Sequence, residues 1–125
     1  MGNRIISYDL GTGGNKASLY DFEGNCLASV FIPYDTLYPR AGWHEQRPED
    51  WWHAVVLGTR KLLEKTGEDR KNIECLAISG HSLGAVPVDK NGRLLRKTVP
   101  IWSDARAQEQ ARKFFANVDE HEWYM

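Results

Sequence analysis

The sequence predicts an α/β domain whose mixed sheet begins with three antiparallel strands and is flanked by helices. Two observations carry this prediction. Apolar residues alternate or cluster through residues 4–33, where two glycine-containing turns interrupt them. Further along, apolar residues recur at helical spacing from Pro48 and are followed by a short apolar run at residues 73–79.

The first third of the chain predicts three strands in succession. Residues 4–10 form an apolar run that ends in a glycine-rich turn, and residues 16–21 alternate roughly as a strand. Glu23-Gly24-Asn25 predicts a tight turn before a third strand at residues 26–33. Residues 34–47 show no clear period and are expected to form a long connection.

A helix is expected to begin at Pro48, because proline suits the first helical position. Glu49 and Asp50 then lie favourably at the positive end of the helix dipole. Helical spacing of apolar residues continues to Leu63, and Gly67 supplies a stop signal. The run at residues 73–79 predicts a buried strand.

The rest of the chain predicts a hairpin, an extended piece and a further helix. Residues 85–89 and 93–95 flank an Asn-Gly turn, and an extended piece ends at Ile101-Trp102. Ser103 or Asp104 is expected to cap a helix that runs to about Ala116. Residues 119–125 are typical of the first turn of another helix, cut short. We therefore expect residues 1–125 to be a partial domain of a longer protein.

Composition bounds the class of partner. Sixteen basic and 17 acidic residues give a net charge of −1, without the basic stripe or polybasic cluster that nucleic acid or a membrane surface would attract. The sequence has no apolar run long enough to span a bilayer and no signal-peptide pattern. Cys26 and Cys75 lack metal-ligand spacing and predict reduced, buried thiols in a cytoplasmic protein.

The stretch from Asp9 to Lys16 is the most informative part of the chain. Asp9 is the kind of group that holds a hydrated divalent cation. Thr12, Gly13 and Gly14 leave backbone N–H groups open to an anion, and Lys16 adds a charge suited to phosphate. The spacing differs from that of the P-loop and of the dinucleotide fingerprint. A nucleotide-phosphate and magnesium site is one interpretation, and a plain Gly-Gly hairpin turn is the other.

Residues 80–84 match G-x-S-x-G, the nucleophile elbow of α/β-hydrolases. The elbow requires a helix directly after the serine, whereas residues 85–89 are β-like and contain a proline. We favour a sharp turn at the carboxyl end of a central strand, where His81 and Ser82 face a small polyhydroxylated ligand. A purely structural role for both residues is the alternative.

Trp102 and Asp104 form a third candidate site. An aromatic face packs against the C–H side of a sugar, and a carboxylate accepts hydrogen bonds from its hydroxyls. The alternative is that Trp102 fills the core while Asp104 caps a helix.

Four segments point to one family when they are taken together. They read DLGTGGNK at residues 9–16, GWHEQRPEDWW at 42–52, ISGHSLG at 78–84 and PIWSDARA at 100–107. In this order they resemble the N-terminal domain of the FGGY carbohydrate kinases, most nearly the xylulokinase-like members, over residues 4–116. The resemblance implies the ribonuclease H-like fold of actin-like and hexokinase-like ATPases.

The resemblance also implies ATP-dependent phosphoryl transfer to a hydroxyl of a ketose or polyol. It implies that Asp9 holds Mg²⁺ through water. The residues that it places at the nucleotide phosphates are Thr12, Gly13, Gly14 and Lys16. The residues that it places around the sugar are His81, Ser82, Trp102 and Asp104. Glu45 and Gln46 match the family segment without an assigned role.

Two departures limit what the resemblance implies. His81 and Leu83 stand where xylulokinases usually carry glutamine and histidine. This departure weakens the case for xylulose as the substrate and leaves a related sugar, alcohol or sugar acid as an alternative. The family's catalytic aspartate and second domain lie beyond Met125, so we expect the 125-residue chain to be inactive by itself. The rival functions are a non-catalytic actin-like module that binds nucleotide or sugar and, less favoured, a hydrolase that uses Ser82. A homodimer is a further expectation for the full-length protein.

Overall fold

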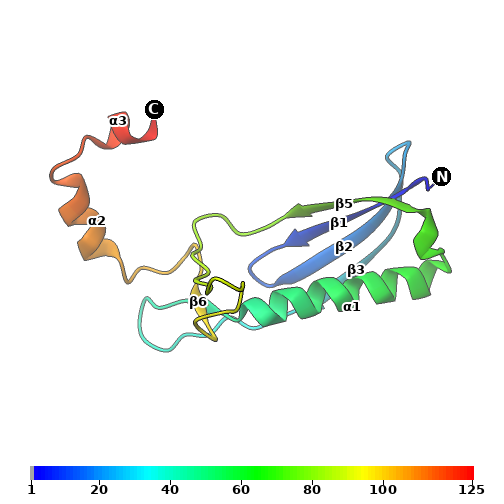
Figure 1. Ribbon diagram of the computed structural model, residues 1–125, viewed down its shortest axis with the longest axis horizontal. Helices are drawn as coiled ribbons and strands as arrows, with labels where there is room; N and C mark the ends of the chain where they lie inside the picture. The colour runs from blue at the N-terminus through cyan, green and yellow to red at the C-terminus, as the bar shows by residue number, and fades with distance from the viewer. Residues whose placement is uncertain (1) are drawn as a thin grey trace.

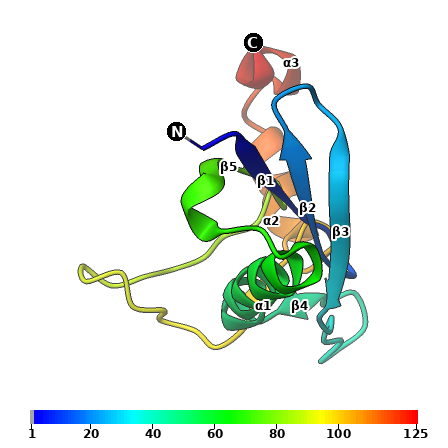
Figure 2. The ribbon, with the colours of Figure 1, turned by 90° about the vertical axis from the view of Figure 1, so that its right-hand side faces the viewer.

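The computed structural model describes residues 2–125 and contains a four-stranded sheet with one long helix across one face (Figures 1 and 2). In sheet order the strands are β3 (Cys26–Pro33), β2 (Gly14–Asp21), β1 (Arg4–Leu10) and β5 (Ile73–Ser79). β1, β2 and β3 pair antiparallel, and β5 pairs parallel with β1. The predicted mixed sheet with three antiparallel opening strands is therefore confirmed.

Helix α1 (Pro48–Thr66) has the predicted bounds. Pro48 occupies the first turn, and Gly67 ends the helix with a left-handed φ of 65° that glycine adopts without a steric penalty. The helix lies mainly across β2 and β3. Gly58 allows this close approach, because a Cβ atom there would lie 3.0 Å from the Cβ atom of Ala17.

The core lies between the sheet and α1. Ile6 and Tyr8 of β1 and Leu19 of β2 are buried together with Leu62 of α1. Because strand side chains alternate between faces, burial of Tyr8 places Asp9 on the opposite face, away from α1. The same alternation that buries the core therefore presents Asp9 to solvent.

Strand β5 is exposed along most of its length, contrary to the prediction of a buried strand. A short 3₁₀ helix, η1 (Arg70–Asn72), leads into it, and Leu76 and Ile78 are 60% and 65% exposed. An apolar groove of about 440 Å³ runs between β5 and α1. No element of residues 2–125 covers this groove or the outer edge of β5. Cys75 on β5 and Cys26 on β3 are free, as expected, but they are exposed instead of buried.

The connecting segments contain short elements that the sequence did not indicate. β4 (Glu45–Gln46) lies within the predicted long connection and pairs with β6 (Val99–Pro100). The predicted Asn-Gly hairpin is present only as a single bridge between Val88 and Leu94.

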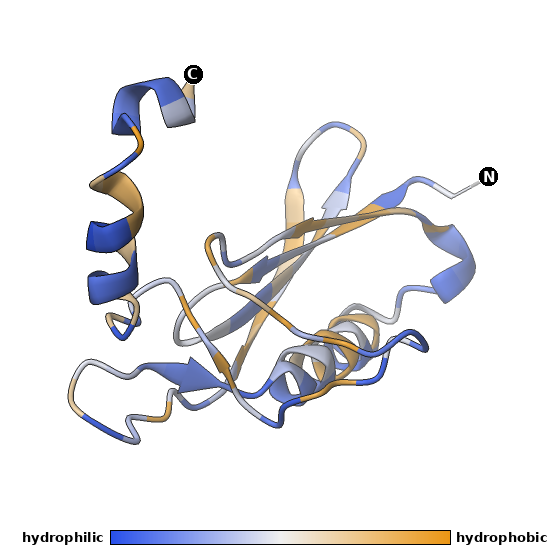
Figure 3. Cartoon of the chain, turned by 60° about the vertical axis from the view of Figure 1, so that its left-hand side comes forward, coloured by the Kyte–Doolittle hydropathy of each residue, from blue (hydrophilic) through white to orange (hydrophobic). Residues whose placement is uncertain are grey.

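The last helices, α2 (Gln108–Phe115) and α3 (Glu120–Tyr124), form an arm that projects from the sheet (Figure 1). Figure 3 shows that α2 has a hydrophilic side and a hydrophobic side. α2 begins at Gln108, three residues later than a helix capped by Asp104 would begin, because the carboxylate of Asp104 is held by Arg106 and by the His44 amide. No helix among the described residues combines the length and apolarity that crossing a bilayer requires.

Candidate functional site

A polar hollow of about 290 Å³ lies where β1 and β5 end. The two strands are parallel neighbours, and Asp9 is the register partner of Ser79, so their carboxyl ends meet at one edge of the sheet. Ligands of open α/β sheets bind at such an edge. The residues that line the hollow are Asp9, Leu10, Gly11, Thr12, Gly80, His81, Ser82 and Trp102.

The turn between β1 and β2 forms one wall of this hollow. The Gly11 amide donates to the Gly14 carbonyl at 3.0 Å and closes the turn. Gly14 is required by close approach, because a Cβ atom there would lie 2.6 Å from the Ile32 carbonyl oxygen. Thr12 and Gly13 at the tip are exposed, and their amides donate to no other group in residues 2–125. The turn therefore presents two free amides to solvent.

Lys16 lies opposite Asp9 in the β1–β2 ladder. Directly paired strand residues project from the same face of a sheet, so the ammonium and the carboxylate both lie on the face away from α1. Both side chains are exposed, and Lys16 does not line the hollow itself. Asp9, the free amides and Lys16 thus surround the turn with the groups that the sequence predicted for a metal-bound phosphate.

The segment after β5 forms the second wall. His81 packs beside Trp51 of α1, with ring centroids 5.4 Å apart and an interplanar angle of 33°. The Nε2 atom of His81 is buried and has no hydrogen-bond partner among the described residues, while Ser82 is exposed. This nitrogen therefore has an unused hydrogen-bonding capacity but almost no surface open to the hollow.

The geometry around Ser82 differs from that of a nucleophile elbow. No helix follows the serine, and residues 80–87 are irregular. No histidine within residues 2–125 is hydrogen-bonded to Ser82. The residue with a positive φ in this segment is Leu83, at 60°, and not Ser82. The helix and base that acyl transfer needs are therefore missing from this turn.

Trp102 links the two walls. Its indole Nε1 donates to the Thr12 hydroxyl at 3.0 Å, and its side chain is 57% exposed, so it does not fill the core. One face of a large aromatic ring is thus left for a ligand beside the free amides of the turn.

Asp104 does not line the hollow, although the sequence placed it beside Trp102 as a sugar ligand. Its carboxylate accepts from the backbone and side chain of Arg106 and from the His44 amide at 2.7–3.0 Å, and its side chain is only 4% exposed. Hydrogen bonding by Arg106 lowers the pKa of Asp104, despite the opposing effect of burial. The carboxylate therefore holds the loop between β6 and α2.

Glu45 and Gln46 have partners that the sequence did not reveal. Glu45 accepts from Thr98 and pairs with Arg106 at 2.7 Å, and hydrogen bonding by Thr98 leads the causes that lower its pKa. Gln46 is fully buried and donates to the Thr12 carbonyl, while its own Oε1 accepts from Trp51. Apart from Trp51, these partners are distant in sequence, and only the family segment had singled the two residues out.

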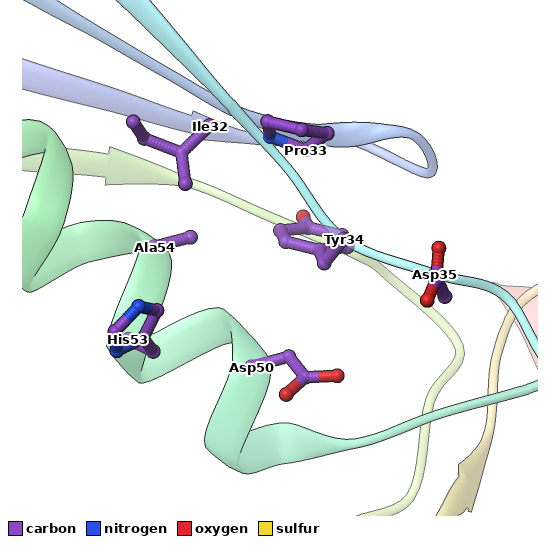
Figure 4. A pocket seen from close by; sticks show the side chains of 7 residues that line it. All are labelled: Ile32, Pro33, Tyr34, Asp35, Asp50, His53 and Ala54. Atoms are coloured by element: carbon purple, nitrogen blue, oxygen red, sulfur yellow. The ribbon is translucent and has the colours of Figure 1, made fainter.

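A second hollow of about 260 Å³ lies between the end of β3 and the first turns of α1. Figure 4 shows the ring of Tyr34 between that strand end and the helix, with Asp50 and His53 on α1. None of its lining residues lines the first hollow. Because none of the groups predicted to bind nucleotide or sugar lines it, the candidate site is the hollow at β1 and β5.

Comparisons with known proteins identify the family of the chain. The family model for the N-terminal domain of the FGGY family of carbohydrate kinases matches residues 4–125. A xylulose kinase of Staphylococcus epidermidis is 33% identical over 109 residues, which cover 87% of this chain and 22% of that protein.

Solved structures share the fold. The crystal structure of a xyloylose kinase from Brucella ovis superposes with a TM-score of 0.86 at 30% identity, covering 91% of this chain and 24% of that one. A Plasmodium falciparum glycerol kinase with ADP shares the fold with a TM-score of 0.84 at 21% identity, over 97% of this chain and 24% of that one. The chain thus spans less than a quarter of the length of these relatives.

Proposed function

The chain belongs to the FGGY family of carbohydrate kinases, and from this premise we propose that it supplies the phosphate-binding and acceptor-binding part of an ATP-dependent sugar or polyol kinase. The observation that carries the proposal is the hollow that the phosphate turn shares with residues 80–82 and Trp102. Phosphoryl transfer depends mainly on positioning and on neutralising charge, and it needs both partners in one space.

The residues of the turn fit a magnesium-bound phosphate chain. Asp9 is an exposed carboxylate at the open edge, suited to hold Mg²⁺ through water, as hard cations prefer oxygen ligands. Mg²⁺ would supply neutralisation of the charge on the β- and γ-phosphates. The free amides of Thr12 and Gly13 would donate to phosphate oxygens beside Gly14, and Lys16 would add a positive charge.

The opposite wall fits a polyhydroxylated acceptor. His81 offers an unpartnered ring nitrogen, Ser82 a hydroxyl and Trp102 an aromatic face. Asp104 would reach an acceptor only if Arg106 released it, so we assign Asp104 the task of holding the Trp102 loop. Because His81 and Leu83 depart from the xylulokinase pattern, the acceptor class is best stated as a ketose, polyol or sugar acid.

Phosphoryl transfer also needs a group that takes the proton of the attacking hydroxyl. Asp9 is the only carboxylate among the described residues that line the hollow, and we assign it to Mg²⁺. We therefore place the base outside these residues and expect the 125-residue chain to be inactive by itself. The free thiols suit a cytoplasmic protein, and a homodimer of the complete protein is a further expectation that sedimentation would test.

The decisive experiment measures ADP release by the complete gene product across a panel of ketoses, polyols and sugar acids. Acceptor-dependent ADP would support the kinase and identify the acceptor, and Asp9→Asn should abolish most of it. Asp21→Asn, at the last residue of β2 and away from the hollow, is the matched control and should retain activity. A folded protein that binds ATP without releasing ADP for any acceptor would refute the kinase and favour a binding module.

A further inference from the structure

The carbonyl groups of Gly11, Thr12 and Gly13, at the tip of the phosphate turn, are all hydrogen-bonded by residues outside the turn. The Tyr34 hydroxyl donates to the Gly11 carbonyl at 2.6 Å, and the Tyr34 amide donates to the Gly13 carbonyl at 3.4 Å. Between them, the Nε2 atom of Gln46 donates to the Thr12 carbonyl at 2.7 Å. Neither Tyr34 nor Gln46 lines the hollow, so the three carbonyls are drawn away from it.

This arrangement determines where the amides point. In a trans peptide the C=O and the following N–H lie in one plane and point in opposite directions. Holding the Gly11 carbonyl therefore directs the Thr12 amide to the other side, and holding the Thr12 carbonyl does the same for the Gly13 amide. These are the two amides that have no partner within residues 2–125.

We propose that Tyr34 and Gln46 are positioning residues, which hold the turn's carbonyls back so that the Thr12 and Gly13 amides face the transferred phosphate. The inference rests on the proposed function, and it assigns roles to two residues that do not touch the ligand. Without the hydrogen bonds from Tyr34 and Gln46, either peptide could rotate and present its carbonyl oxygen to the phosphate. The partial negative charge of that oxygen would repel the anion.

Both side chains are suited to donate permanently. Burial, with the nearby charge of Asp9, raises the pKa of Tyr34 to about 12, so its hydroxyl remains a donor in alkaline as well as neutral solution. The amide of Gln46 is oriented by Trp51, whose Nε1 donates to Oε1 at 2.9 Å and leaves Nε2 to face Thr12. Because Trp51 also packs on His81, Gln46 connects the phosphate wall of the hollow to the acceptor wall.

The test uses two variants of the complete gene product that remove one donor each. Tyr34→Phe deletes only the hydroxyl, and Gln46→Glu exchanges the donating NH₂ group for a carboxylate oxygen. The matched controls are Tyr38→Phe and Gln110→Glu, which make the same chemical changes at exposed positions outside both hollows. Calorimetry measures binding of magnesium pyrophosphate, a probe that needs the turn but neither acceptor nor turnover.

We expect Tyr34→Phe to weaken pyrophosphate binding about three- to tenfold, the share of one hydrogen bond. Gln46→Glu should weaken it at least as much, because it also adds a negative charge behind the turn. In turnover assays Tyr34→Phe should raise the KM for ATP or lower kcat while the KM for the acceptor stays unchanged. Thermal melts establish that each variant is folded. If Gln46→Glu does not fold, the result for Tyr34→Phe decides the test.

Three results would overturn the inference. The first is a pyrophosphate affinity of the Tyr34 and Gln46 variants equal to that of the controls. The second is an equal increase in the KM for ATP and the KM for the acceptor. The third is a wild-type protein that does not bind pyrophosphate. Failure of the proposed function looks different. In that case the wild type binds pyrophosphate with the predicted dependence on Tyr34 and Gln46 but releases no ADP for any acceptor.

Discussion

Replacing Arg106 by methionine should destabilise the domain strongly at neutral pH and much less in acid. Arg106 lies between Asp104 and Glu45 and makes side-chain hydrogen bonds of 2.7–2.8 Å to both. Its guanidinium carbon also lies 3.9 Å from the centroid of the Trp43 ring. Methionine keeps most of the stem over that ring but removes the charge and the donors.

The magnitude follows from the burial of the two carboxylates. The side chains of Asp104 and Glu45 are 4% and 6% exposed, so loss of Arg106 leaves both carboxylates with little water around them, and only Glu45 keeps another cation, Arg96 at 3.6 Å. Removing one partner of a buried pair costs about 3–5 kcal/mol. Because Arg106 itself is 19% exposed, some water would replace it, and we expect about 2–4 kcal/mol at pH 7.

The pH dependence should have opposite signs in the two proteins. In the wild type Arg106 holds the pKa of Asp104 below its ordinary value, so the stabilisation is complete above about pH 5 and is lost as the pH falls through the folded-state pKa. In the variant, burial raises the pKa of Asp104 once the Arg106 side chain is gone, whereas the Thr98 hydrogen bond and Arg96 still lower that of Glu45. Protonation of Asp104 then relieves the variant as the pH falls, and the gap between the free energies of unfolding of the two proteins narrows.

Urea denaturation at pH 7 and pH 4, followed by tryptophan fluorescence, measures this gap, and urea leaves the charges unscreened. Arg112→Met, at an exposed position on α2, is the matched control and should change the free energy of unfolding by less than about 0.5 kcal/mol. A cost below about 1 kcal/mol at pH 7, or a gap that is as wide at pH 4, would refute the reasoning.

Three further experiments test the fold and the site. Gly14→Ala should lower the free energy of unfolding by about 1–3 kcal/mol, because the new Cβ atom meets the Ile32 carbonyl, whereas Gly13→Ala has open space and should change it little; urea denaturation compares them. Leu62→Ala should cost about 2–5 kcal/mol by the same measurement, since the side chain is fully buried between α1 and the sheet, and a loss below about 1 kcal/mol would contradict this core. A fluorophosphonate probe should leave Ser82 unlabelled, as judged by mass spectrometry, and labelling that Ser82→Ala abolishes would revive the hydrolase.

The elements that the sequence predicted well are those whose signals are local. The alternation in β1 and β2 and the Pro48 and Gly67 signals of α1 each arise within a few residues. The position of the hollow was also predictable, because the carboxyl ends of β1 and β5 must meet at one edge if the strands are parallel neighbours.

The features that the sequence did not predict depend on distant partners. Asp104 reads as a helix cap in isolation, but Arg106 and the distant His44 amide occupy its oxygens, so α2 begins later. The tether from Gln46 to the Thr12 carbonyl joins residues with no shared pattern of spacing. Cys75 was expected to be buried because its strand is apolar, yet burial depends on what packs against β5, which local periodicity does not report.

The place of β1 in the sheet has a consequence for how the domain folds. β1 pairs with β2 across a tight turn but with β5 only after the whole of α1, so its two edges acquire their partners at very different loop-closure costs. Hairpins with short turns close within microseconds, whereas non-local parallel pairing is slow. We expect β1, β2 and β3 to be protected first in a pulse-labelled hydrogen-exchange experiment, and β5 last. During synthesis the phosphate turn would then take shape before the segment that faces it has left the ribosome.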